Sequence, residues 1–198
     1  LSTFALNEVN KMFEEIEMKP QDIDKIIVVN GPGSFTGIRI GVTIAKVFAW
    51  SLNKEITTIS SLEAMSASCL SDKLLVPIIN ARRNCVFGAI YEHDKVILEG
   101  EYLSLEKLML ILNGLQKKYL LISNDLFNNL KCEKYDPDIL KIVNRFMMRD
   151  SINPHLVNPN YFEPFYTNPI GIILLTFMIM YYIIYIIIVN KIMKVRMW

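Results

Sequence analysis

Residues that cross-link a fold or bind metals are scarce in this sequence. Its 198 residues include three cysteines and two histidines. The number of cysteines is odd, and no two of them (Cys69, Cys85 and Cys132) have C-x-x-C spacing. The two histidines, His93 and His155, lie far apart in the sequence and form no H-E-x-x-H pattern. This scarcity argues against a disulfide framework and against a structural zinc site, and it favours a reduced, cytoplasmic setting.

An excess of charge of either sign is also missing. The formal net charge is +1, so no overall field attracts the chain to nucleic acid. We interpret the basic pair Arg82-Arg83 as a solvated turn, and we expect contact with RNA only indirectly, through a partner. No secretory signal opens the sequence. Because Leu1 already lies close to a helical pattern, we expect the sequence to begin partway into a gene product.

Charged residues are absent from one long apolar stretch, residues 170–189. Lys191, Lys194 and Arg196 follow it, as they would follow a transmembrane helix whose C-terminus lies inside. From residue 170 onward, however, the sequence has no Asp, Glu, Ala or Ser, a bias expected when AT-rich DNA is read in the wrong frame. Three interpretations of this tail stay open: a frameshift or read-through artefact, a membrane-anchoring helix, and a packed helix.

The first part of the sequence alternates between helical and extended patterns. Helices are predicted over residues 2–18, 36–52 and 61–69, and strands over 26–29 and 55–59. Lys19-Pro20 should end the first helix, because proline cannot continue the hydrogen-bond ladder. Ser60 and Glu63 match a capping box that begins the third helix. This order predicts right-handed crossovers and a parallel sheet.

From Leu74 onward, consecutive strands replace this alternation. Strands are predicted over residues 74–79, 85–91, 95–103 and 119–123. Ser104 can cap a helix through about Leu112, and Asp136-Pro137 can begin another through about Met147, with Pro137 at its first position. Residues 155–166 are predicted to form a packed terminal segment. We therefore expect three parts: a partial N-terminal lobe (1–70), a C-terminal lobe with the terminal segment (71–168), and the apolar tail (169–198).

The loop Gly31–Gly37 follows a predicted strand, begins a helix, and fails every standard glycine-loop signature. A Walker A loop requires lysine where Ile38 stands, and four residues rather than five between its glycines. The dinucleotide fingerprint requires a glycine at Thr36. A nucleophile elbow around Ser34 requires glycines at Pro32 and Thr36. The loop therefore predicts neither nucleotide binding nor hydrolysis by itself.

The physical interpretation of this loop is a tight strand-to-helix turn. Glycines would permit positive φ, proline would stiffen the turn, and a hydroxyl would cap the helix. An anion site at the helix N-terminus is the alternative. The residues that we assign to this structural loop are Gly31, Pro32, Gly33, Ser34, Thr36 and Arg39.

The helix after the loop carries small residues spaced by four, namely Gly37, Gly41, Ala45 and Ala49. They should form one ridge that lets another backbone come close. A helix that is apolar nearly all round is buried on more than one side. The neighbour of the ridge is either the first helix or another protein, and the sequence physics alone leaves these two alternatives open.

At this loop the sequence resembles the TsaB (YeaZ) family, and the resemblance covers roughly residues 1–166. Three further segments are similar to that family. The matching segments are Gly31-Pro32-Gly33-Ser34-Phe35-Thr36-Gly37-Ile38-Arg39-Ile40-Gly41, Thr58-Ile59-Ser60-Ser61-Leu62-Glu63-Ala64, Ala81-Arg82-Arg83, and Pro159-x-Tyr161.

The resemblance implies an α/β, actin/Hsp70-like (ASKHA) nucleotidase-type fold with two lobes. It also implies a non-catalytic scaffold subunit that binds and activates TsaD, the subunit that transfers threonylcarbamoyl to adenosine 37 of tRNA. TsaE joins the complex, TsaC supplies the threonylcarbamoyl adenylate, and a homodimer is an alternative assembly. No cofactor is expected on the chain alone, whereas ATP or ADP can bind at the interface of the assembled complex.

The resemblance further implies that the partner surface is formed by the first two helices. The residues that we expect to bind the partner are Gly37, Ile38, Gly41, Val42, Ala45, Ala49, Leu6, Val9 and Phe13.

The sequence departs from the family in three respects. The strands that precede the first helix in the family are absent, which should leave an exposed strand edge in the first lobe. Asn80 stands where the family usually has aspartate, and the tail from Ile170 does not match. Two other functions stay open: a nucleotide-binding or peptidase-like enzyme acting through Ser34, and a membrane-anchored binding module.

Overall fold

The computed structural model describes residues 2–127 and 130–161, together with residues 173, 176, 177, 180 and 181. The chain divides into two compact units, Leu1–Phe162 and Glu163–Trp198, and the first unit holds both sheets. The apolar helix predicted over residues 170–189 lies largely outside the described residues. Among the described residues, no helix is both long enough and apolar enough to cross a membrane.

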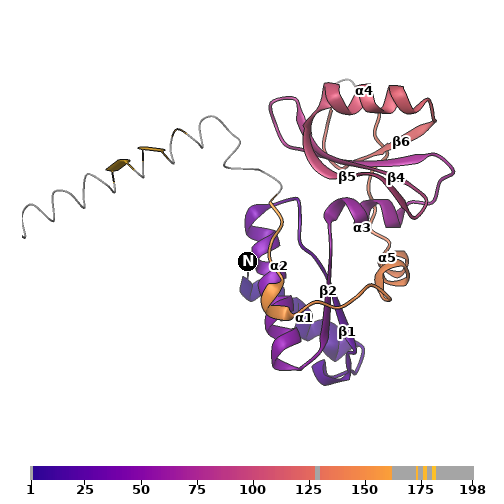
Figure 1. The fold of residues 1–198 in the computed structure, drawn as a ribbon. Helices are drawn as coiled ribbons and strands as arrows, with labels where there is room; N and C mark the ends of the chain where they lie inside the picture. Colours follow the sequence, from indigo (N-terminus) through magenta and orange to yellow (C-terminus); the bar gives the residue numbers. More distant parts are fainter. Residues whose placement is uncertain (1, 128–129, 162–172, 174–175, 178–179, 182–198) are drawn as a thin grey trace, which may run out of the picture. The chain divides into compact units, whose positions relative to one another are not determined.

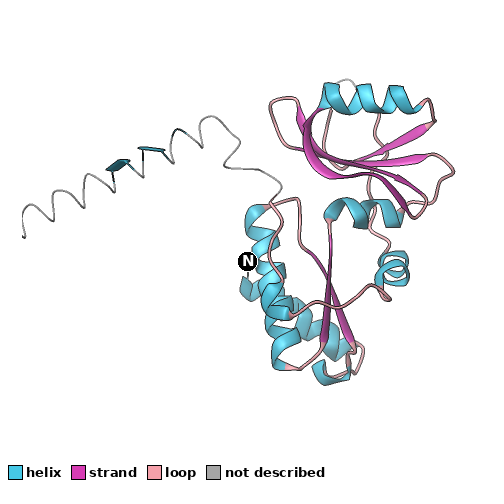
Figure 2. Ribbon diagram, viewed as in Figure 1, coloured by secondary structure: helices cyan, strands magenta, loops and turns pink. Residues whose placement is uncertain are grey.

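Helices and strands follow the predicted order along the chain (Figures 1 and 2). The helices are α1 (Ser2–Glu15), α2 (Phe35–Ser51), α3 (Ser61–Ser68), α4 (Leu105–Leu115) and α5 (Ile139–Phe146), with 3-10 turns at η1 (Pro20–Asp22) and η2 (Pro154–Leu156). The strands are β1 (Lys25–Val29), β2 (Glu55–Ile59), β3 (Leu74–Asn80), β4 (Cys85–Glu92), β5 (Lys95–Ser104) and β6 (Tyr119–Ile122). Each predicted strand is confirmed to within one residue at either end.

The first helix is shorter than predicted. α1 ends at Glu15 because Glu17 takes a left-handed backbone with φ 53°, and the N–H of Met18 donates to the carbonyl oxygen of Phe13 at 3.1 Å. This bond pattern is a standard helix stop. The prediction that Lys19-Pro20 ends the helix was therefore wrong, since Pro20 begins η1 instead.

The start of the last helix also differs from the prediction. α5 begins at Ile139, and Asp138 caps it by accepting a hydrogen bond from the N–H of Lys141 at 3.1 Å. Pro137 therefore precedes the helix and does not occupy its first position. The cap is the ordinary side-chain solution for an unpaired helical N–H.

The first sheet consists of β1 and β2, paired in parallel over their whole length. On one face, Val28 and Ile56 pack against buried residues of α2. On the other face, Ile59 packs against Ala64 of α3 and Phe146 of α5. The strands are thus covered on both faces, as the β-branched runs predicted.

Residues 149–160 return to this first sheet and complete it. The N–H of Ile152 donates to the carbonyl oxygen of Ile56 at 2.8 Å, on the edge of β2 that faces away from β1. The hydroxyl of Thr57 donates to the carbonyl oxygen of Asp150 at 2.6 Å. Val157, at 1% exposure, enters the core beside α2. One edge is therefore covered, whereas no strand of the described part pairs with the other edge of β1.

The second sheet has the order β5-β4-β3-β6, with β6 parallel to β3 and the other pairs antiparallel. Its side chains alternate between two covering helices, as the strand period requires. Val76 and Ile78 of β3 pack with Leu108 of α4. Leu75, the residue before Val76, packs on the opposite face with Leu62 of α3. α3 therefore serves both sheets, through Leu62 on one side and Ala64 on the other. Figure 1 shows α3 between the two sheets.

Candidate functional site

The glycine loop is held between α3 and the returning C-terminal segment. The carbonyl oxygen of Gly31 accepts the N–H of Ser61 at 2.8 Å, and the N–H of Asn160 donates to the carbonyl oxygen of Asn30 at 2.7 Å. Gly31 has φ 118°, and a Cβ at this position would overlap the carbonyl oxygen of Asn160. Glycine is required here both for the backbone angle and for the close approach.

Ser34 performs the capping role that the sequence predicted. Its hydroxyl oxygen accepts the N–H of Gly37 at 3.3 Å, so Ser34 and not Thr36 is the cap of α2. Pro32 is buried beneath the turn. The interpretation of this loop as a tight, capped strand-to-helix turn is therefore confirmed.

The position of Ser34 at the start of α2 argues against a peptidase site that pairs Ser34 with His155. The ring of His155 lies edge-on to Trp50, with centroids 6.2 Å apart, at the opposite end of α2 from Ser34. Sixteen helical residues separate Trp50 from Ser34, a rise of roughly 24 Å. His155 is therefore too distant to act as a base for Ser34. Within the described ranges, no group of three or more His, Cys, Asp or Glu side chains gathers to hold a metal ion.

An aromatic stack sits at the exposed beginning of α2. The ring of Phe35 stacks on Tyr161 with centroids 4.8 Å apart, and the guanidinium of Arg39 lies 5.2 Å from the Phe35 centroid. Tyr161 belongs to the Pro159-x-Tyr161 segment, so the sequence gave a signal for it without showing its contact. The anion site that was expected near Arg39 stays a prediction.

The small-residue positions of α2 do not share one environment, in contrast to the single ridge that their spacing predicted. Ala45 and Ala49 are buried in the core of the first sheet together with Val42. Gly37 and Gly41 are exposed at the other end of the helix. The returning segment and the sheet thus fill the C-terminal half of this face, and only the N-terminal half stays open.

On α1, the predicted partner residues also divide by burial. Phe13 is buried and stacks on Phe48 of α2, with centroids 6.5 Å apart and planes 6° from parallel. Val9 and, on α2, Ile38 are half-buried, whereas Leu6 is exposed. Side chains that are buried in the chain's own core offer no surface to a partner. Phe13, Val42, Ala45 and Ala49 therefore offer little surface on the isolated chain, and their contact with a partner stays a prediction.

The remaining surface of these helices is apolar. Several large side chains of α1 and α2 are exposed, and Trp50 and Phe4 are each at 66%. The exposed large apolar residues of the two helices are Phe4, Leu6, Met12, Phe35, Val47 and Trp50, and the exposed Ile16 directly follows α1. We use the name α1–α2 face for the exposed surface of these two helices, which includes this set together with Gly37 and Gly41. The set lies on more than one side of α2, because Trp50 is nine residues, about two and a half turns, from Gly41.

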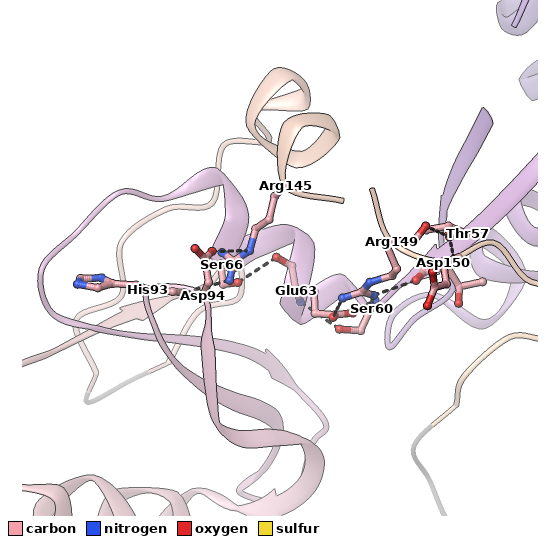
Figure 3. A network of polar contacts seen from close by, with 10 residues as sticks. Thr57, Ser60, Glu63, Ser66, His93, Asp94, Arg145, Arg149 and Asp150 are labelled. Atoms are coloured by element: carbon pink, nitrogen blue, oxygen red, sulfur yellow. Dashed lines mark hydrogen bonds and ion pairs between the residues drawn. The ribbon is translucent and has the colours of Figure 1, made fainter. Parts of the chain in front are cut away.

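A second polar feature links the two sheets through α5 (Figure 3). The guanidinium of Arg149 donates to Glu63 at 2.6 Å and to the carbonyl oxygen of Thr58 at 3.1 Å. One turn earlier, Arg145 lies 3.4 Å from the carboxylate of Asp94 in the β4–β5 turn. Both arginines thus extend from the α5 region toward different sheets. No motif in the sequence marked them, because the pairing joins residues far apart along the chain.

Glu63 has two roles at this link. Its carboxylate accepts the N–H of Ser60 at 2.7 Å, and its own N–H donates to the Ser60 hydroxyl at 3.0 Å, which confirms the predicted capping box. Burial raises the pKa of Glu63, but the hydrogen bonds from Arg149 and from the Ser60 N–H outweigh burial and hold the pKa below its usual value. The carboxylate is therefore ionised at neutral pH and available to Arg149.

Comparison of the sequence with known proteins shows the relatives of this chain. A family model described as "TsaD: tRNA N6-adenosine threonylcarbamoyltransferase" matches residues 3–133, more than half of the chain. A Bacillus subtilis (strain 168) protein described as "tRNA threonylcarbamoyladenosine biosynthesis protein TsaB" is 44% identical over 99 residues. The chain belongs to this family, in its TsaB (YeaZ) branch. The resemblance of the glycine-loop segment to TsaB is thereby confirmed.

The match to TsaB relatives is partial in length. It covers 50% of this chain and 43% of the Bacillus protein. A TsaB protein of Buchnera aphidicola subsp. Acyrthosiphon pisum (strain APS) is 28% identical over 131 residues, which is 62% of this chain and 59% of that protein. The chain thus spans about half the length of these TsaB relatives.

The fold is shared with a solved structure as well. A protein described as "an uncharacterized protein with similarity to peptidase YEAZ from Pseudomonas aeruginosa" superposes with a TM-score of 0.63 at 16% identity. The superposition covers 80% of this chain and 82% of that chain. At this identity the likeness shows the fold alone. The mixed α/β architecture expected for a TsaB-type chain is confirmed.

Proposed function

We propose that this chain is a non-catalytic scaffold subunit that binds and activates TsaD during threonylcarbamoyl transfer to tRNA. The observation that supports this proposal most directly is the environment of Gly41. Among the described residues, no atom lies within 4 Å of the position that a Cβ of Gly41 would occupy, apart from its own helix backbone and chain neighbours. The chain's own packing gives no reason for glycine at this position.

Glycine in the interior of a helix has a measurable cost. Gly41 destabilises α2 by about 1 kcal/mol relative to alanine, and Gly37, in the first turn, costs less. An added Cβ at Gly37 would meet only Ser34, at an ordinary 3.4 Å. Both costs are offset if a partner backbone approaches α2 closely at this point, as small residues permit between packed helices.

The exposed surface of α1 and α2 fits a protein partner. The α1–α2 face exposes several large apolar side chains, among them Phe4 and Trp50. A surface with many exposed large apolar side chains is typical of an interaction site. A helical pair with an apolar surface and two glycines suits the docking of another helix or helical hairpin. We propose that TsaD supplies it.

The proposal extends to the other components. TsaE joins the TsaD-bound complex, and TsaC acts upstream by supplying the threonylcarbamoyl adenylate. ATP or ADP binds at the interface of the assembled complex and not to the isolated chain. In the absence of TsaD, a homodimer through the same α1–α2 face is the competing assembly.

The test is to mix the chain with TsaD from the same organism and to measure the mass of the product by light scattering on a sizing column. We expect the wild-type chain to form a complex and Gly41→Leu to lose it. Leucine at residue 41 fits the isolated chain because the space beside it is open. The loss should therefore occur without loss of folding, which a circular dichroism melt would verify.

The chain offers a matched control for this substitution. Gly114 lies in α4 over the second sheet, and no atom of the described part of the chain lies within 4 Å of its Cβ position either. Gly114→Leu makes the same chemical change on a different helix and should leave the complex intact. A complex that survives Gly41→Leu, or that is lost equally in Gly114→Leu, would contradict the proposed surface. A folded wild-type chain that never binds TsaD would contradict the scaffold role.

A further inference from the structure

The turn between β3 and β4 has an unusual backbone. Arg82, Arg83 and Asn84 take φ values of 65°, 51° and 58°, so three consecutive non-glycine residues are left-handed. This region is unfavourable for arginine, because its Cβ approaches the following carbonyl oxygen. Such positions persist only where the surroundings fix them, and they cluster at ligand-binding sites.

Hydrogen bonds to the backbone fix this turn from both sides. The Oδ1 of Asn80 accepts the N–H of Arg82 at 2.8 Å, and the carbonyl oxygen of Arg82 accepts the N–H of Cys85 at 2.8 Å. The carbonyl oxygen of Asn84 accepts the N–H of Leu105, the first residue of α4, at 2.8 Å. None of these bonds uses an arginine side chain, so both guanidinium groups are left for other contacts.

The two arginines are exposed and carry no counter-charge. Across residues 2–127 and 130–161, no carboxylate lies within ion-pair distance of Arg82 or Arg83, whereas both arginines of the α5 region are ion-paired. The carboxylate of Asp125 accepts the N–H of Asn80 at 2.6 Å and does not line the pocket beside the turn. The turn therefore presents two unpaired positive charges on a fixed backbone.

A pocket of about 220 Å³, the arginine pocket, lies beside these charges. Its walls combine cationic, amide and aromatic side chains with no Asp or Glu. The residues that define it here are Asn80, Arg82, Arg83, Asn84, Leu105 and Phe127. Phe127 is half-buried and packs against the core of the second sheet, which holds its ring in place.

This lining differs from that of another surface pocket on the same unit. The pocket of about 730 Å³ at the end of α3 combines three lysines with Glu133, Asp136 and Asp138, so its charges balance. The arginine pocket is positive and is also smaller than the roughly 300–1,000 Å³ typical of sites for whole small-molecule ligands. Its size and charge suit one unit of an anionic polymer.

We propose that the arginine pocket binds an unpaired stretch of RNA, with a base against the Phe127 ring and the flanking phosphates on Arg82 and Arg83. Arginine forms paired hydrogen bonds with phosphate oxygens. Proteins recognise single-stranded RNA by stacking its bases on aromatic rings and by bonding their edges to amide side chains such as those of Asn80 and Asn84. An acidic peptide would satisfy the arginines but would leave the ring and the amides without a role.

The inference goes beyond the proposed scaffold function, because it gives the chain a direct RNA contact in addition to the indirect one through TsaD. The choice of RNA rests on the pocket's own combination of ring, amide and guanidinium groups. The contact lies on the second sheet, whereas the proposed TsaD surface lies on α1 and α2. The two can therefore fail independently, and the RNA test uses the full chain without TsaD.

The test is fluorescence anisotropy with a short labelled RNA hairpin that carries an unpaired loop, measured over a range of salt concentrations. We expect Arg82→Ala/Arg83→Ala to weaken binding at least tenfold. The slope of log affinity against log salt should fall by about 1.4, since each single-strand phosphate contact contributes about 0.7. Phe127→Leu keeps an apolar side chain but removes the ring, and it should weaken binding about tenfold.

Two control variants separate a built site from general charge. Lys107→Ala/Lys117→Ala removes two cations that are already paired with Glu101 and Glu92, and it should change the affinity less than twofold. Asn80→Asp keeps an acceptor for the Arg82 N–H but adds a negative charge to the pocket, so it should weaken binding severalfold. Circular dichroism melts of all variants verify that each is folded.

Several outcomes would overturn the inference. They are an absence of hairpin binding by the folded chain at physiological salt, an unchanged salt slope in the double arginine variant, and an equal loss in the lysine control. Full competition by free ATP would assign the pocket to a nucleotide, and competition by poly-glutamate in preference to unlabelled RNA would assign it to an acidic protein. In either case RNA would be the wrong ligand.

Discussion

The two sheets of the first unit reach a complete core in different ways. The four strands of the second sheet, residues 74–122, gather a large buried cluster of leucine, isoleucine and valine with α4. The first sheet has two strands, and its cluster beside α2 relies on Ala45 and Ala49 together with Val157 from the returning segment. The second sheet is thus built from one continuous stretch of chain, whereas the first requires residues more than ninety positions downstream of β2.

The comparison shows that a two-stranded parallel sheet buries too little apolar surface by itself. Two strands cannot bury enough apolar surface for independent stability, so other elements must supply it. Here α5, Ile152 and Val157 do so, and Arg149 adds a polar tie to Glu63. The second sheet needs none of these residues for its main cluster.

The largest expected effects come from replacing one buried side chain in the core of each sheet with alanine and comparing the two losses of stability. Leu108→Ala, at a fully buried side chain of α4, should lower the free energy of unfolding by about 2–5 kcal/mol. Urea unfolding followed by circular dichroism measures this loss. Val157→Ala should cost less, because it removes fewer methyl groups.

The locations of the two effects should differ more than their sizes. Native-state hydrogen exchange should show faster exchange of β1 and β2 amides in Val157→Ala, with the amides of β3 and β4 unchanged. Equal acceleration in both sheets by Val157→Ala would show that the two cores are one cooperative unit, and the contrast would then be wrong.

The next largest effect is expected where the returning segment meets the glycine loop. Gly31→Ala should destabilise the chain by about 3 kcal/mol, because alanine is strained at a φ of 118° and its Cβ would displace the carbonyl oxygen of Asn160. A thermal melt measures the change. As the counterpart in α4, Gly114→Ala has open space and should stabilise by up to about 1 kcal/mol. A neutral Gly31→Ala would show that residue 160 does not close on the loop.

A smaller effect is expected at the polar tie between α5 and α3. Arg149→Lys should cost about 1 kcal/mol, because the pair is partly exposed and lysine cannot reach Glu63 and the Thr58 carbonyl oxygen together. A double-mutant cycle with Glu63→Gln, measured by urea unfolding, should give a coupling of similar size. Strict additivity would mean that the contact contributes no stability.

The smallest effect concerns the pH dependence of that tie. Because the folded-state pKa of Glu63 lies below its usual value, its stabilising contribution is present above the unfolded pKa and is lost as pH falls through the folded pKa. Unfolding free energies measured across the acid range should therefore fall less steeply in Glu63→Gln than in the wild type. Parallel curves would assign the acid sensitivity of the chain to other carboxylates.

Local chemistry in the sequence predicted most of the elements. Strand positions followed from β-branched runs, and the caps at Ser34, Ser60 and Ser104 are hydrogen-bonded as their spacing indicated. The end of α1 was missed because Glu17 adopts a left-handed stop that usually belongs to glycine. Propensity alone gives no signal for such an exception.

Tertiary contacts explain what the sequence did not predict at the candidate site. The four-residue spacing of small residues on α2 correctly marked close packing, but it did not show that Ala45 and Ala49 face the sheet while Gly41 does not. Helical periodicity predicts which residues share one face of a helix. How much of that face is buried depends on the elements that pack against it, which periodicity does not predict. The links made by Arg145 and Arg149 were missed for the same reason, since they join distant parts of the chain.

The position of Val157 in the first core has a consequence for synthesis on the ribosome. Domains usually acquire structure in the order in which they emerge, with the N-terminal region first. In this chain every buried member of the second sheet's main cluster has emerged by residue 121, while β1 and β2 must wait for residues 152–157. The later-encoded sheet therefore matures first. Until then the nascent chain carries an unfinished parallel pair whose exposed apolar strands are open to capture by chaperones.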